Sequence, residues 1–136
     1  MELNELSLKL SQYETEGSSF ESFFINHVGQ EVLQVIVDGN DELPIFVTRT
    51  DEQILCICYL FSEAEINTDK HAELNDTLLR LNVPMPLSAF AKIDDRYAVF
   101  GALSTSSTIE QLSHEIITLS ANSIDALEAI SDYLTE

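Results

Sequence analysis

The chain has 136 residues, a length that fits one domain spanning residues 1–136. Its 24 aspartates and glutamates against 6 lysines and arginines give a formal net charge of -18, which repels phosphate backbones and anionic lipid. Nucleic acid partners and direct membrane insertion are therefore not expected. No run approaches the ~20 apolar residues that span a bilayer, and the first residues lack a signal-peptide pattern, so we expect a cytoplasmic protein.

The first 29 residues carry weaker signals than the rest of the chain. Leu3, Leu6, Leu10 and Tyr13 recur at intervals of three and four, which predicts one apolar stripe on a short helix. Glycine and serine at positions 17–19 end this pattern. The aromatic-rich stretch that follows, FESFFINH, indicates a further strand only weakly.

Three apolar runs follow, EVLQVIVDG, LPIFVTRT and QILCICYLF, and short segments rich in turn formers separate them. This pattern predicts an antiparallel meander. Pro44 stands at the start of the second run, where a missing N–H is tolerated. The third run is apolar at almost every position, so we expect a central strand that is covered on both faces.

A helix over residues 69–82 is the next expected element. Ser62 and Glu65 have capping-box spacing ahead of it. Asn75 and Asn82 lie two turns apart beside its apolar stripe. The helix should stop at Asn82, because asparagine enters the left-handed conformation readily and Val83 precedes a proline. The stripe is predicted to contain Leu74, Leu78 and Leu81, widened by Leu79.

The last part of the chain predicts a second hairpin, LSAFAKI and YAVFGALS around DDR, and then the longest helix. Ser107 and Glu110 have capping-box spacing before this helix, which should span about residues 108–134. The predicted order is α-β-β-β-α-β-β-α. It indicates an α+β domain with a mainly antiparallel sheet of about five strands.

No pattern in the sequence indicates catalysis, a cofactor or a metal. Cys56 and Cys58 point to one face of a strand, where a disulfide between them would be strained, so buried reduced thiols are expected. His27, His71 and His114 are isolated in sequence. The pairs of acidic residues in the three hairpin turns are interpreted as solvent-exposed turn residues and not as a calcium site. A non-enzymatic protein is the first hypothesis, and an enzyme or small-ligand sensor with a pocket around Cys58 or His27 is the alternative.

Apolar surface in excess of what one small domain can bury is the main functional indication. The first and last helices should cover one face of the sheet, which leaves only the helix at 69–82 for the other face. One short helix hardly covers five strands. We therefore expect a homodimer or the capture of a partner segment, by β-augmentation or in a groove.

Three segments carry a resemblance to a known family: ELPIFVTRTDEQILCICYLF, AELNDTLLRLNVPMPLSAFAKIDDRYAVFGALS and the final helix. They resemble the YjfI-like family of bacterial proteins over most of residues 30–134, whereas the first 29 residues match poorly. More distantly, the order of elements and the helix with two asparagines are similar to YbjN-like proteins and type III secretion chaperones.

The resemblance implies a small, acidic, cytoplasmic, chaperone-like protein that dimerises and binds extended segments of partners. It also suggests a PspA-like membrane-stress protein as a partner, because YjfI-like genes often neighbour a gene for one. Six motif residues are carried over from it, and Leu78 joins them on the helix face. The candidate structural or interaction residues are Pro44, Asn75, Leu78, Asn82, Pro84, Pro86 and Phe90.

Overall fold

The computed structural model describes residues 2–15, 17–27 and 29–135, with the side chain of His27, one of the alternative pocket residues, lying outside the described part. Its helices are α1 (Leu3–Ser11), α2 (His71–Leu81) and α3 (Ile109–Ile130), with short 3-10 turns η1 (Glu63–Glu65) and η2 (Ser131–Tyr133). The strands are β1 (Glu14–Thr15), β2 (Ser18–His27), β3 (Gln30–Val37), β4 (Ile45–Arg49), β5 (Ile54–Ser62), β6 (Ala89–Ile93) and β7 (Arg96–Leu103).

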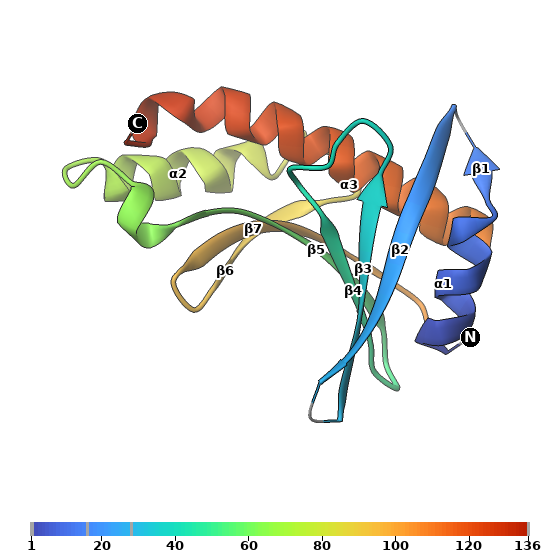
Figure 1. Ribbon diagram of the computed structural model, residues 1–136. Helices are drawn as coiled ribbons and strands as arrows, with labels where there is room; N and C mark the ends of the chain where they lie inside the picture. The colour runs from blue at the N-terminus through green and yellow to red at the C-terminus, as the bar shows by residue number, and fades with distance from the viewer. Residues whose placement is uncertain (1, 16, 28, 136) are drawn as a thin grey trace.

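The described strands form one antiparallel sheet in the order β1-β2-β3-β4-β5-β7-β6, so the α+β class is confirmed (Figure 1). The expected number of about five strands is wrong, because the sheet has seven. The weakly indicated stretch at 20–27 is a full strand: β2 pairs with β3 from Phe20↔Val37 to His27↔Gln30. The meander β3-β4-β5 and the interior position of β5 are as predicted.

All three helices pack on the same face of the sheet, which we call the inner face. Leu3, Leu6 and Leu10 of α1 share a buried cluster with Leu112, Ile116 and Leu119 of α3, and with the inward side chains of β3, β4 and β5. Leu74 and Leu78 of α2 join a second cluster on that face with Phe61 of β5, Tyr97 of β7 and Ile130 of α3. Figure 1 shows α2 running beside α3.

The placement of α2 corrects two expectations about the sheet. We expected α2 to cover the opposite face, but its leucines reach the inner face instead. As a result no described element covers the outer face, and β5 is buried on one side only: Ile54, Cys56 and Cys58 are buried, whereas Leu55 and Ile57 are half-buried. Residues 1–29, whose packing the sequence left open, contribute α1 and β2 to the domain.

The ends of the long helix also differ from the prediction. The capping box is formed by Thr108 and Gln111 instead of Ser107 and Glu110: Thr108 Oγ1 accepts from the Gln111 amide (3.2 Å), and Gln111 Oε1 accepts from the Thr108 amide (2.9 Å). The helix ends at Ile130, and Leu134 forms a bridge with Ile66. The predicted capping box of Ser62 and Glu65 is confirmed at η1.

One carboxyl group lies inside the contact between α3 and the sheet. Glu115 is 5% exposed, and its side chain lies against the Cα of Gly101 on β7. Burial raises the pKa of this carboxyl, an effect that His114 reduces in part. A Cβ atom at position 101 would collide with Oε1 of Glu115, so glycine at this position makes room for the buried carboxyl.

Replacing Gly101 by alanine should lower the free energy of unfolding by about 1 to 3 kcal/mol, the usual cost of overpacking. In a Glu115→Ala background the same substitution should cost much less, because the group that it meets is gone. Urea unfolding of the four proteins measures this coupling. Equal costs in the two backgrounds would contradict the assigned contact.

Candidate protein-binding groove and open sheet face

A groove of about 310 Å³ separates α2 from the edge strand β6. We call it the α2–β6 groove. It brings together four of the seven candidate residues, Asn75, Leu78, Asn82 and Phe90, although the chain separates them by up to 15 positions. The remaining lining residues come from the same elements and from β7: Leu79, Ala91, Lys92 and Tyr97.

The two asparagines of α2 both reach across to the sheet. Oδ1 of Asn75 accepts a hydrogen bond from the Tyr97 hydroxyl (2.7 Å), and Oδ1 of Asn82 accepts one from the backbone amide of Phe90 (2.7 Å). Seven residues make nearly two full turns, so both side chains leave the helix on the same side. The asparagines therefore fix α2 to β7 at one end of the groove and to β6 at the other.

The leucines of α2 divide into core residues and a groove rim. Leu78 is 5% exposed and belongs to the second buried cluster, whereas Leu79 is 70% exposed. Leu79 was expected to widen the buried stripe, but it lies at the rim of the groove instead. A large apolar side chain is thus presented to solvent beside the open edge of the sheet.

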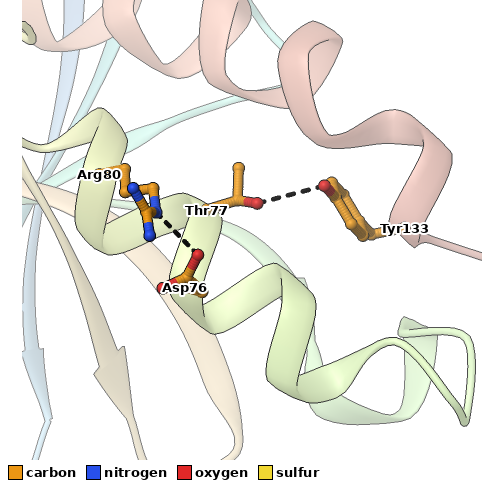
Figure 2. Close-up of polar contacts among 4 residues, drawn as sticks. All are labelled: Asp76, Thr77, Arg80 and Tyr133. Carbon is orange, nitrogen blue, oxygen red and sulfur yellow. Dashed lines mark hydrogen bonds and ion pairs between the residues drawn. The ribbon is translucent and has the colours of Figure 1, made fainter.

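The side of α2 away from the groove is tied to the end of the chain, as Figure 2 shows. The Thr77 hydroxyl lies 3.1 Å from the Tyr133 hydroxyl, in hydrogen-bonding distance, and Arg80 Nε donates to Asp76 Oδ2 (2.8 Å) within the helix. The amide of Asn67, ahead of α2, donates to the carbonyl of Tyr133 (2.9 Å). The two contacts with Tyr133 hold α2 in place while its groove side remains open.

The two prolines lie in the loop between α2 and β6. Pro84 and Pro86 line a second hollow of about 230 Å³ between this loop and α3, and Phe90 separates it from the α2–β6 groove. The carbonyl of Pro86 accepts from Asn122 Nδ2 (2.9 Å), which ties the loop to α3. Both prolines therefore shape the loop that delivers Phe90 to the groove.

The conformation that ends α2 differs from the expected one. The helix stops where predicted, but Asn82 keeps helical dihedrals (φ -61, ψ -34) because its side chain is used to bind the Phe90 amide. The positive φ occurs later, at Leu87 (φ 65), between the carbonyl of Pro86 and the amide of Ser88, which are hydrogen-bonded (2.8 Å). A leucine in this tight turn is strained.

The remaining candidate, Pro44, stays a strand-start residue. It precedes β4, which β5 and β7 separate from β6 in the sheet. Pro44 does not line either of the two hollows beside Phe90.

The basic residue that lines the groove, Lys92, is already paired with an acid. Lys92 Nζ lies 3.0 Å from Glu63 Oε1 and 5.4 Å from the centroid of the Tyr97 ring. Their hydrogen bond raises the pKa of Lys92 and lowers the pKa of Glu63. The free charge near the groove is therefore negative, with Asp94 and Asp95 exposed at the end of β6.

The outer face of the sheet is a second surface of interest, and it is apolar across the strands. Cross-strand register aligns six residues in one row from β2 to β6: Phe23, Gln34, Phe46, Ile57, Phe100 and Ala89. A neighbouring row holds Tyr59, Ala98 and Ala91, and a third holds Thr48, Leu55 and Ala102. These three rows contain no acidic residue, although the chain has 24.

Aromatic contacts organise the centre of this face. The rings of Phe46 and Tyr59 lie 5.9 Å apart between centroids, and the guanidinium carbon of Arg96 lies 3.7 Å from the centroid of the Tyr59 ring. Sequence reasoning did not single out Phe46, Ile57 or Phe100. For Ile57 the signal was present in QILCICYLF, whose apolar residues at almost every position imply two apolar faces.

The described side chains also bear on the chemistry considered from the sequence. Cys56 and Cys58 are free, buried thiols, as expected. Burial raises the pKa of both, the Glu115 carboxylate raises that of Cys56 further, and a hydrogen bond with Ser123 partly offsets the rise at Cys58. Within the described residues, no group of three or more histidines, cysteines or acids could hold a metal ion. None of the described helices combines the length and apolarity that crossing a membrane requires.

Replacing Asn82 by alanine should lower the free energy of unfolding by about 1 to 3 kcal/mol, because the Phe90 amide loses its acceptor. Asn82→Asp keeps an acceptor oxygen and should cost less. Chemical denaturation of both variants gives the comparison. If aspartate and alanine destabilise equally, the hydrogen bond to Phe90 is not what position 82 contributes.

Comparison with known proteins supports the resemblance on which the candidate residues were chosen. The chain is 31% identical over 105 residues to "Uncharacterized protein YjfI" of Escherichia coli strain K12, covering 73% of this chain and 77% of that protein. The YjfI protein of E. coli O157:H7 gives the same values. A model of the family described as "Uncharacterized protein conserved in bacteria (DUF2170)" matches residues 1–134, so the first 29 residues, expected to match poorly, fall inside the match. The chain therefore belongs to the DUF2170 family of bacterial proteins.

Proposed function

We propose that this protein is a non-enzymatic, chaperone-like protein-binding module that acts in the cytoplasm as a homodimer. The observation that carries the proposal is the outer face of the sheet, which is mainly apolar across six strands and which no described element covers. A surface of this kind is usually an interaction site in a protein of ordinary composition.

A second copy of the chain is the occupant that we propose for this face. Two copies repel each other through a net charge of -18 each, so they can approach closely only through a surface where acids are few. The three central rows of the outer face contain none, and Glu21 lies on this face at β2, near its margin. The row from Phe23 to Ala89 crosses five strand spacings, roughly 24 Å. That width suits face-to-face packing of two sheets, with the aromatic side chains of Phe46 and Phe100 in the contact.

The dimer leaves the α2–β6 groove free for a different polypeptide. A PspA-like membrane-stress protein is the partner that the family resemblance suggests. The proposed likeness to YbjN-like proteins and type III secretion chaperones rests on the order of elements, three helices on an antiparallel sheet, and on an acidic surface. Fold-level likeness alone does not determine function, so the binding surfaces carry the proposal.

Ile57→Glu, at the centre of the outer face, should convert the dimer to a monomer by burying an unpaired charge in the contact. Light scattering coupled to gel filtration should give twice the 15.2 kDa chain mass for the wild type and one chain mass for the variant. Leu8→Glu, on the exposed side of α1, is the matched control and should remain dimeric.

Thr48→Glu offers a milder change in a neighbouring row of the outer face, for use if Ile57→Glu fails to fold. It should also weaken the dimer. A wild-type protein that stays monomeric at about 100 µM, far above the Kd of a stable dimer, would overturn the dimer proposal.

The alternative, a pocket enzyme or sensor built around Cys58, makes an opposite prediction about thiol reactivity. We expect both native thiols to react with a disulfide reagent at least about 100-fold more slowly than in the unfolded chain, because burial and a raised pKa suppress the thiolate. A Ser106→Cys variant supplies an exposed thiol as a positive control. A fast native thiol at position 56 or 58 would favour the alternative.

A further inference from the structure

The free edge of β6 presents backbone groups to which no described strand is paired. β6 pairs with β7 alone, and the Phe90 amide donates to Asn82 Oδ1, so this amide points away from β7. Backbone groups two residues apart point to the same side of a strand. The carbonyl of Phe90 and both backbone groups of Lys92 therefore face the free edge, next to the α2–β6 groove.

Asn82 already occupies the first position of this edge. Its side-chain oxygen binds the Phe90 amide in the place that the carbonyl of an added strand would take. An incoming strand can thus pair with the edge only from the Phe90 carbonyl onward. Unpaired strand edges are templates for strand addition, so an extended backbone is the chemistry that this edge recognises.

Side chains of an added strand would alternate between two surroundings. Those on the inner side would lie beside Phe90 and Lys92 and enter the groove, where Leu78 forms part of the wall and Leu79 the exposed rim. Those on the outer side would lie beside Ala89 and Ala91, whose small side chains leave room. The groove therefore favours one large apolar residue on the inner side.

The charges around the groove select the flanking residues of the segment. Lys92 is neutralised by Glu63, while the exposed acids of residues 94–95 adjoin the strand. An acidic segment would be repelled by these groups and by the net charge of -18. This includes a second copy of the chain, which is equally acidic. Lysine and arginine in the segment would be attracted.

We propose that the α2–β6 groove binds an extended segment of a partner protein, which adds to the sheet at β6, inserts an apolar side chain between α2 and β6 and carries flanking basic residues. This inference deepens the proposed protein-binding function and rests on it. It concerns a surface different from the outer face, so each can fail without the other.

Phage-displayed random dodecapeptides selected on the full-length protein test the inference. The enriched peptides should combine alternating apolar residues with net positive charge. Synthesised peptides should lose at least about tenfold in affinity on Leu79→Glu, roughly the effect of 1.4 kcal/mol. Leu8→Glu on α1 has a similar exposure and should bind them as the wild type does.

Lys92→Pro and Lys92→Gln isolate the backbone contribution. Both remove the ion pair with Glu63, but only proline removes the amide that faces the free edge, and this amide is not used for pairing with β7. Peptides should bind the glutamine variant and lose at least about tenfold on the proline variant, the effect of one lost hydrogen bond. Equal binding to the two variants would overturn strand addition.

N-methylated peptides answer the same question without altering the protein. Methylation of alternate backbone amides should abolish binding in one of the two possible sets, the set that faces β6, and leave it unchanged in the other. Equal effects of both sets, no enriched peptide, or enriched acidic peptides would overturn the inference. Dimer mass measured on the same protein shows whether the outer-face proposal stands independently.

Discussion

Burial of apolar side chains against a single face of the sheet is the constraint on which the rest of the structure depends. The leucines of α1 and α2 and the inner seam of α3 meet the inward residues of β3, β4, β5 and β7 there. Because this core is completed by all the described helices, every one of them packs on the same face of the sheet. The outward residues of the same strands, Phe46, Ile57 and Phe100 among them, are then only half-buried on the outer face. The open face is thus a consequence of how the core is completed, and it makes a second polypeptide energetically useful.

The packing of α2 shows how the same constraint produces the groove. Leu74 and Leu78 anchor the helix at the β5–β7 end of the inner face, close to the edge strand. The side-chain oxygens of Asn75 and Asn82 then accept hydrogen bonds from the Tyr97 hydroxyl and the Phe90 amide. These bonds hold α2 at a fixed distance from the β7–β6 end of the sheet and keep the helix from covering the free edge of β6. A strained turn at Leu87 returns the chain to the sheet at Phe90. The groove is therefore a gap that hydrogen bonds hold open at its two ends and that apolar side chains line between them.

The sequence predicted the features that depend on local residue patterns. It did not predict the features that depend on which face of the sheet a helix packs against. The meander, the end of α2 and the buried thiols follow from periodicity, proline placement and apolar runs. The residue pattern of HAELNDTLLRLN does not indicate that its leucines pack on the inner face, because an amphipathic helix can pack against either face of a sheet. Leu79 was assigned to the core for the same reason, whereas Asn75 and Asn82 were chosen without knowledge of the groups to which they hydrogen-bond. The long strand at 18–27 was only weakly indicated, since aromatic residues on both faces hide the alternation of a paired strand.

The distribution of charge separates the two surfaces by the kind of polypeptide that each can accept. The central rows of the outer face hold no acid, so a second copy meets no repulsion between carboxylates there once it has approached. Arg96, stacked on Tyr59, places one cation per copy on this face. At the groove the situation is reversed, because the charge of Lys92 is cancelled by Glu63 while further carboxylates remain exposed beside the strand. Repulsion of other acidic chains is strongest at low salt and is screened beyond about 8 Å at physiological ionic strength. The negative charge around the α2–β6 groove thus repels acidic segments at a distance. The apolar walls and the free edge of β6 then select a segment by its shape. Self-association and partner capture can therefore occur on one small domain without competing for the same surface.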